Sequence, residues 1–300
     1  MPRVLSLLLV LAVVMAACGS SSEPATDGIV VVTTTTVLGD IVSNIVGERA
    51  TVEVLLPIGA DPHEFRASAQ QVALMESSAL VVANGLGLEQ GLGDILDSVE
   101  DDGRAVLRVG EQLTALRQIG GGPADPHVWM DPLQMVEATT VIAAELERIL
   151  PGGEWVARGA DYASELVDLD VEISDLLGAS WGEPGDGRIL VTNHDSLGYF
   201  AERYRFEVVG VVVPGGSTLA QPSSSDLADL VAILRDTGIR AIFAETTEPT
   251  ALVESVAAEV GGDVSVVELF IGSLGGPGSG AETYIEMLRT DATLIAAELG

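Results

Sequence analysis

Short apolar runs alternate with longer segments of helical periodicity along most of the chain. Runs rich in valine, isoleucine and leucine occur in the first half at 29–35, 50–56, 79–84 and 105–109. Similar runs occur in the second half at 188–192, 206–213, 241–245 and 263–270. Apolar runs of this length between helical segments predict the buried strands of parallel βαβ units. The pattern favours an α/β fold, with a first helix expected at 39–46.

A different pattern separates the two groups of runs. Between residues 132 and 179 the sequence has two long helical stretches divided by PGGE, and no segment there has the character of a strand. We therefore expect two α/β lobes with parallel sheets, at 29–150 and 186–300, joined by a long linking helix within 151–185.

The N-terminal segment has the features of a bacterial export signal. Arg3 precedes a mostly apolar run, and small residues then lead to Cys18. The tetrapeptide MAAC resembles the lipobox of bacterial lipoproteins, although Met15 replaces the usual leucine. We expect 1–17 to be a signal peptide, Cys18 to carry lipid, and 18–28 to form a flexible tether. The competing interpretation is an ordinary cysteine in a membrane segment.

Composition narrows the possible partners. The chain has 45 acidic and 14 basic residues and a formal charge of -31. Such a charge repels the phosphate backbone, which excludes nucleic acid, and attracts cations. Because Cys18 is the only cysteine, thiolate metal sites and intramolecular disulfides are excluded. A bound metal would need nitrogen and oxygen donors.

All three histidines follow strand-like runs. His63 and His127 stand in two copies of the tripeptide DPH, and His194 directly follows the fifth apolar run. Ligands of open α/β sheets bind at the carboxyl ends of the strands, where Glu245 also ends a run. A single histidine is more often structural, but three in equivalent positions predict ligands. Three imidazoles and one oxygen form a usual tetrahedral zinc site.

Residues beside the histidines have simpler explanations. Asp131 and Ser68 are placed to cap helices, and Trp129 is expected to contribute packing. Asp61 and Asp125 either form turns or orient an imidazole, and the sequence leaves both roles open.

Five stretches are distinctive as an ordered set. They are VEVLLPIGADPHEFRASAQQVALMESSALVVANGLGLE, DPHVWMDP, VTNHDSLGYFAERY, AIFAE and VELFIGSLGGPGSGAETYIEML. From about residue 29 to the C-terminus, the chain resembles the zinc- and manganese-binding solute receptors of bacterial metal ABC importers. The resemblance implies two lobes bridged by a rigid helix, with one metal bound in the cleft between them.

The same resemblance assigns ligands. It implies that His63, His127 and His194 bind the metal. Manganese-type members tend to have a carboxylate at the third position, so His194 favours zinc. Many members have a ligating aspartate where this chain has Gly272, which cannot bind through a side chain. For the missing ligand we expect Glu245, directly or through water, with a hydrogen-bonding role in the cleft loops as the alternative.

The expected function is that of a receptor, not an enzyme. It would capture Zn(II), or less readily Mn(II), outside the cytoplasm as a monomer anchored to the membrane through Cys18. The sequence has no Walker-type phosphate loop, so the permease and the cytoplasmic ATPase must be other proteins. Two alternatives stay open: a secreted three-histidine zinc hydrolase with Glu245 as general base, and a surface adhesin with a structural metal.

Overall fold

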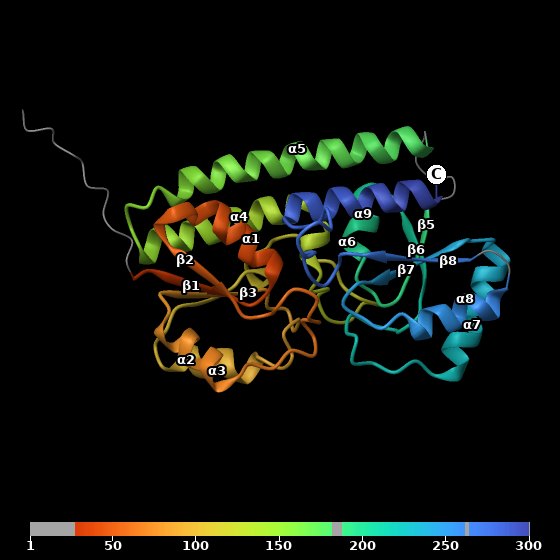
Figure 1. The fold of residues 1–300 in the computed structure, drawn as a ribbon, viewed down its shortest axis with the longest axis horizontal. Coiled ribbons are helices and arrows are strands. Elements are labelled where there is room, and N and C mark those ends of the chain that lie inside the picture. The colour runs from red at the N-terminus through yellow and green to blue at the C-terminus, as the bar shows by residue number, and fades with distance from the viewer. Residues whose placement is uncertain (1–27, 182–187, 262–263, 300) are drawn as a thin grey trace, which may run out of the picture.

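The molecule has two lobes that lie side by side beneath a long helix (Figure 1). The computed structural model describes residues 28–181, 188–261 and 264–299. The expected signal peptide and Cys18 lie outside these residues. Within them, no helix has both the length and the apolar character needed to cross a bilayer.

Each lobe contains a sheet of four parallel strands, in the orders β2-β1-β3-β4 and β6-β5-β7-β8. The strands of the first sheet are β1 (Val30–Thr33), β2 (Thr51–Val54), β3 (Leu80–Ala83) and β4 (Val106–Arg108). Those of the second are β5 (Ile189–Thr192), β6 (Glu207–Val211), β7 (Ala241–Glu245) and β8 (Ser265–Leu269). Every apolar run expected to form a strand contains one, and the α/β fold class is confirmed.

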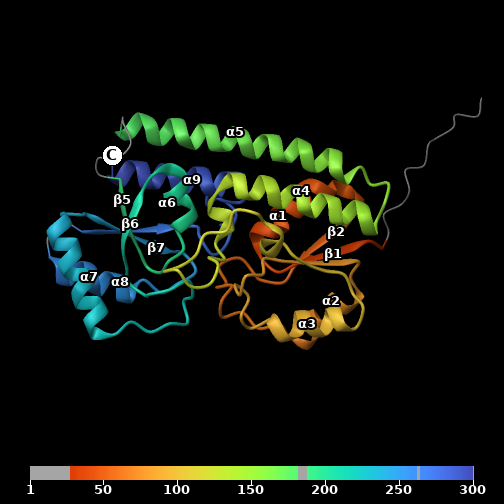
Figure 2. The same ribbon diagram turned by 180° about the vertical axis from the view of Figure 1, so that it is seen from behind.

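Helices connect these strands and join the lobes. The first lobe contains α1 (Thr36–Val46), α2 (Ala69–Ser77), α3 (Gly93–Asp101) and α4 (Pro132–Ile149). The second contains α6 (Gly198–Tyr204), α7 (Ser224–Thr237), α8 (Ala251–Val260) and α9 (Tyr284–Leu299). Between them α5 (Trp155–Trp181) has 27 residues, about 40 Å of helix, and passes over both lobes (Figures 1 and 2).

One apolar core continues through both lobes. It includes Val31 of the first sheet and Leu190 of the second, together with Leu166 and Ile173 of α5 and Ile295 of α9, all buried. Removing this surface from water stabilises the folded chain, and the same contacts hold the lobes to α5 and α9. A separate apolar cluster covers the other face of each sheet.

Helix α1 begins earlier than the sequence pattern predicts. The pattern predicts a start near residue 39, but the helix begins at Thr36. The hydroxyl of Thr35 accepts a hydrogen bond from the Leu38 amide over 3.2 Å and caps the helix. The threonine run resembles a strand because its residues are β-branched, and this cap overrides that propensity. The caps expected at Ser68 and Asp131 are both present.

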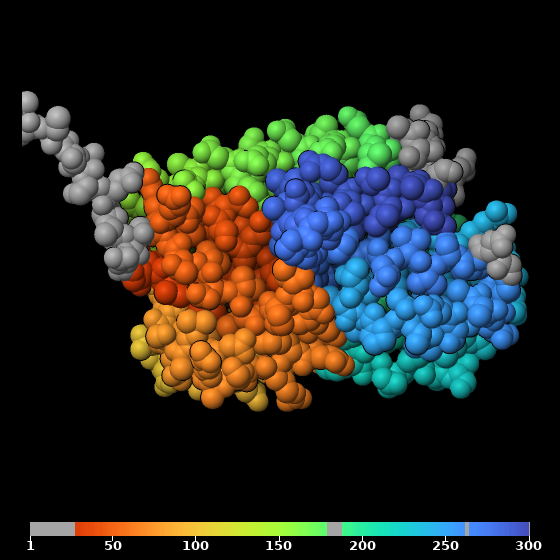
Figure 3. All heavy atoms as spheres, viewed as in Figure 1, coloured from red at the N-terminus to blue at the C-terminus, as the bar shows by residue number. Residues whose placement is uncertain are grey.

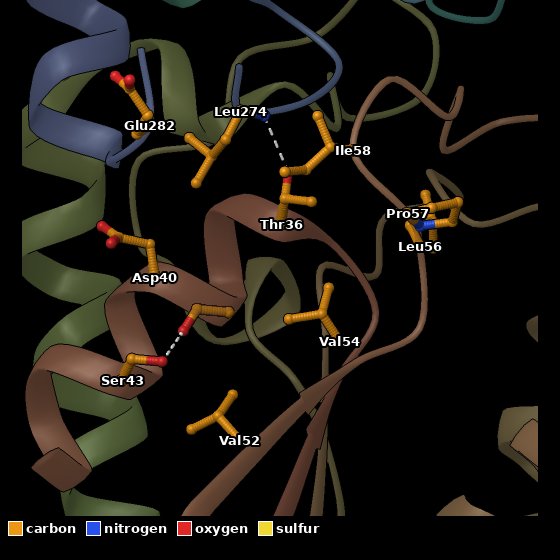
Figure 4. Close-up of a pocket in the computed structure, with 11 residues that line it drawn as sticks. Thr36, Asp40, Ser43, Val52, Val54, Leu56, Pro57, Ile58, Leu274 and Glu282 are labelled. Carbon is orange, nitrogen blue, oxygen red and sulfur yellow. Dashed lines mark hydrogen bonds between the residues drawn. The ribbon is translucent and has the colours of Figure 1, made fainter. Parts of the chain in front are cut away.

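The lobes touch along a seam that is visible on the surface (Figure 3). A hollow of about 440 Å³ lies on this seam, lined by α1, β2 and the segment before α9 (Figure 4). There the Leu274 amide donates a hydrogen bond of 2.9 Å to Thr36 Oγ1. No histidine lines the hollow, so it is separate from the candidate metal centre.

Candidate metal centre

The three histidines lie together between the lobes. Each histidine contributes one ring nitrogen to a group of three, and these three nitrogens all lie within 4.8 Å of one another. Each of the three residues is at most 2% exposed. The ring centroids of His127 and His194 are 5.0 Å apart, and that of His63 is 5.5 Å from both. His63 follows β2, His194 follows β5, and His127 precedes the 3₁₀ helix Val128–Met130. Loops from both lobes therefore build one buried cluster.

The repeated tripeptide DPH forms the same turn twice. The amide of His63 donates to Asp61 Oδ1 over 2.9 Å, and the amide of His127 donates to Asp125 Oδ1 over 3.0 Å. A carboxylate that accepts from the amide two residues later closes an Asx turn, and the intervening proline restricts its backbone. The repetition thus places two histidines at the end of the same kind of turn.

Asp125 also orients the imidazole of His127. Its Oδ1 lies 2.8 Å from His127 Nδ1, and its Oδ2 accepts a hydrogen bond of 2.9 Å from Arg117. Burial raises the pKa of Asp125, but His127 and Arg117 outweigh it and hold the pKa below its ordinary value. An ionised carboxylate only accepts hydrogen bonds, so His127 Nδ1 carries the proton and Nε2 keeps its lone pair.

Glu245 plays the corresponding part for His194. Its Oε1 lies 2.7 Å from His194 Nδ1, and its side chain is 3% exposed. Burial alone would raise the pKa of Glu245, but the adjacent His194 has the larger effect and holds the pKa below its ordinary value. The carboxylate is therefore ionised. Of the two roles expected for Glu245, this position supports the hydrogen-bonding role in the cleft over direct binding of the metal. The carboxylate contacts the ring nitrogen on the far side from the cluster, and Glu245 is not in the converging set.

The arrangement of ring nitrogens fits a cation. His127 Nε2 and His194 Nε2 face each other at 3.1 Å, a distance at which one ring donates a proton to the other unless a metal cation takes the place of that proton. Both ring nitrogens of His63 are buried without a hydrogen-bond partner. Burial, together with the two neighbouring imidazoles, lowers the pKa of His63 to about 3. His63 is therefore a neutral, unpaired donor beside the other two.

A second group of polar side chains lies beside the cluster where the lobes meet. Thr218 Oγ1 donates to Asp61 Oδ2 over 2.6 Å, and Gln90 Nε2 donates to Ser217 Oγ over 2.9 Å. Glu248, in the turn after β7, shares a hydrogen bond with Asp61. Neither Thr218 nor Glu248 stands in a sequence motif that indicates metal binding. The rule that ligands gather at strand ends could have found Glu248, because it stands in the same strand-end loop as Glu245.

A buried carboxylate supports the loop that carries His127. Glu89 accepts hydrogen bonds from Thr34 Oγ1 over 2.6 Å and from the Asn84 amide over 2.7 Å. The Asn84 side chain donates to the carbonyl of Pro126 over 3.0 Å. These bonds connect the ends of β1 and β3 to the second DPH turn. Sequence reasoning missed the role of Glu89, because nothing in its local context distinguishes it from a surface acid.

The position of Gly272 supplies no donor. A Cβ atom there would lie 2.8 Å from Thr247 Oγ1 and 3.4 Å from Glu245 Oε2, so the glycine faces the strand end that carries Glu245. Trp129 packs, as expected: its ring lies 5.3 Å from that of His127, and its Nε1 donates to the Ile271 carbonyl over 2.8 Å. Among the described residues, the converging donors are three nitrogens.

The chain is similar in sequence and fold to proteins of known identity. Residues 31–298 match the family ZnuA, described as zinc-uptake complex component A, periplasmic. The manganese-binding lipoprotein MntA of Halalkalibacterium halodurans is 31% identical over 255 residues, 84% of this chain and 82% of that protein. The zinc-binding protein TroA of Treponema pallidum is 31% identical over 271 residues, 88% of this chain and 86% of that protein.

A solved structure agrees with the sequence relatives. The periplasmic zinc-binding protein TroA from Treponema pallidum superimposes with a TM-score of 0.84 at 31% identity, covering 91% of this chain and 99% of that chain. The two-lobed architecture is therefore that of a known metal-binding protein.

Proposed function

The chain belongs to the family of zinc-uptake complex component A, the metal-binding solute receptors of ABC importers, and from this we propose that its cargo is zinc. It is a binding protein and not an enzyme. The relatives include both a zinc-binding and a manganese-binding protein, so the choice of metal depends on the residues of this site.

The donor set supports zinc over manganese. The proposed ligands are His63, His127 and His194, whose nitrogens converge in a buried cluster. Manganese prefers oxygen donors and binds such sites more weakly, whereas imidazole suits zinc. The observation that carries the proposal is the pair of Nε2 atoms facing each other at 3.1 Å beside the unpartnered ring of His63. In this proposal zinc replaces the positive charge that the site otherwise requires.

The remaining parts of the transport system follow from the family. We propose that the receptor is a monomer outside the cytoplasm, anchored through Cys18, and delivers zinc to a membrane permease. A separate cytoplasmic ATPase would drive that permease. Relatives named as lipoproteins support the anchor.

The metal site is tested with protein that lacks residues 1–17. Purified and stripped with a chelator, this protein is expected to bind one zinc ion per chain and to prefer zinc over manganese. Replacing His63, His127 or His194 with alanine is expected to weaken zinc binding by more than about 100-fold, beyond the loss typical of orienting residues. Competition with a chromophoric chelator measures the affinity, and circular dichroism confirms that each variant is folded.

Two results would contradict the proposal. Folded variants that keep the wild-type zinc affinity would remove the three-histidine site. Tighter binding of manganese than of zinc by the wild-type protein would leave the site in place and reverse the assignment of its cargo.

A further inference from the structure

Three imidazoles leave a zinc ion one ligand short. Zinc in proteins is commonly tetrahedral, and three neutral nitrogens do not balance its double charge. Glu245 is committed to the outer nitrogen of His194, and Gly272 has no side chain to offer. The missing donor must therefore come from another residue or from solvent.

Asp61 is close to the cluster but is already engaged. Its Oδ1 accepts from the His63 amide over 2.9 Å, and its Oδ2 accepts from Thr218 Oγ1 over 2.6 Å. Moving this carboxylate onto a metal would break the turn that positions His63. Asp61 is better suited to hold that turn.

Glu248 has a carboxyl group without such a structural duty. It lies in the turn after β7, where its amide donates to the Glu245 carbonyl over 3.1 Å. Its side chain shares a hydrogen bond with Asp61, which also accepts from the His63 amide, so Glu248 lies beside the turn that carries His63. Among the described carboxylates that interact with the histidines, it is the one free to move without loss of a turn or an imidazole contact.

Glu248 also lies near the position that Gly272 leaves without a donor. A Cβ on Gly272 would contact the side chain of Thr247, the immediate neighbour of Glu248. The turn after β7 and the segment after β8 therefore approach the same region of the cleft.

The charges around Glu248 favour an incoming cation. Burial, followed by the nearby Asp61 and Glu245 carboxylates, raises the pKa of Glu248 to about 8. The carboxyl groups of Glu248, Asp61 and Glu245 are thus crowded together. A divalent cation relieves this repulsion by attracting the Glu248 carboxylate.

We propose that Glu248 swings from Asp61 onto the bound metal and supplies the fourth, oxygen ligand that Gly272 cannot provide. The inference rests on the proposed three-histidine zinc site. It assigns Glu248 a specificity role as well, because a movable carboxylate adds the oxygen donor that lets the site hold manganese weakly.

The test compares two substitutions of equal charge. Glu248→Gln is expected to weaken zinc binding by at least about tenfold, since loss of a ligand should cost no less than loss of an orienting group. Glu268→Gln is the control, because Glu268 is exposed on β8 and has the same charge. Zinc affinity is measured as for the histidine variants, and the control is expected to match the wild type.

Cobalt(II) adds a readout that reports on the ligand itself. With Glu248 bound, the wild-type site has no exchangeable position, so azide should leave the visible spectrum of the cobalt protein unchanged. In Glu248→Gln a water replaces the carboxylate, and azide should alter the spectrum. A wild-type spectrum that responds to azide, or equal zinc affinities for Glu248→Gln and Glu268→Gln, would overturn the assignment.

These outcomes separate the two proposals. If alanine at any of the three histidines abolishes binding while Glu248→Gln keeps full affinity, Glu248 is not a ligand and the receptor site stands. If the histidine variants bind zinc normally, the three-histidine site fails, and the assignment of Glu248 fails with it.

Discussion

At the residue scale, identical tripeptides give their histidines different surroundings. Both DPH turns close through the same aspartate-to-amide bond. In the second turn Asp125 Oδ1 also contacts the imidazole of His127. In the first turn Asp61 Oδ2 instead accepts a hydrogen bond from Thr218 of the other lobe. As a result His127 is oriented from behind, and His63 has both ring nitrogens free for a ligand.

Orienting carboxylates should affect affinity without binding the metal. Glu245→Gln and Asp125→Asn are each expected to weaken zinc binding about 10- to 100-fold, because each removes the negative charge that fixes the Nδ1 proton of a histidine. Competition titration measures the loss. Glu207→Gln serves as the control. Glu207 is exposed at the start of β6, which is the end of the strand away from the cleft loops.

The cobalt spectrum distinguishes this role from that of a ligand. Azide should leave the spectrum of cobalt-loaded Glu245→Gln unchanged, as in the wild type. A new response to azide in this variant would return Glu245 to the set of ligands.

At the scale of elements, strands were the most predictable feature and boundaries the least. Strands of such sheets are rich in apolar residues, and every strand of the described chain lies within a mostly apolar run, including the edge strand β2, which is largely exposed. The start of α1 depends instead on the hydroxyl of Thr35, which accepts a hydrogen bond from the Leu38 amide. In the sequence, a threonine that caps a helix looks the same as a threonine that belongs to a strand. Boundaries depend on single contacts, whereas strands depend on several residues together.

Helix α9 contains a buried acid that should make stability depend on pH. Asp291 accepts a hydrogen bond of 2.9 Å from the Phe270 amide, while its second oxygen is buried without a partner. Burial raises the pKa of Asp291 from 3.8 to about 7. The folded chain therefore retains a proton that the unfolded chain loses, and stability falls as pH rises from about 4 to about 7.

Asp291→Asn should remove this dependence. The amide keeps the acceptor for Phe270 and carries no charge, so the variant is expected to be more stable than wild type at pH 8, by at most ~4 kcal/mol. At pH 4 the two proteins should be similar. Thermal unfolding of chelator-treated protein at both pH values checks this, and a difference in melting temperature that does not change with pH would contradict it.

At the scale of the whole molecule, the lobes are joined by a common core. Residues of both sheets, α5 and α9 belong to one apolar cluster, so the lobes share buried surface as well as a linking helix. The metal centre lies at their junction, and bonds such as that from Thr218 to Asp61 cross it. Movement of one lobe against the other would thus change the surroundings of His63 directly.

Attachment of the whole molecule to the membrane is expected to depend on Cys18, near the N-terminus. Cys18 is the only cysteine and follows an apolar N-terminal run, so Cys18→Ser is expected to release the protein from membranes of a bacterial expression host. Fractionation and incorporation of labelled fatty acid measure the anchor. Zinc affinity of the released protein should equal that of the wild type, since the site lies within the folded lobes. A serine variant that stays with the membranes, together with an unlabelled wild type, would exclude lipidation.

The sequence by itself determined the parallel α/β lobes and the long helix between them, because these follow from apolar periodicity. It also predicted the three histidines as ligands, from the rule that ligands collect at strand ends. Only the tertiary structure decided which nitrogen of each imidazole faces the centre and that Glu245 stands behind His194. It also placed Glu248 beside Asp61. The physical reason is distance along the chain: these contacts join residues of different strand ends, and local patterns contain no information about which side chains meet when the lobes pack together.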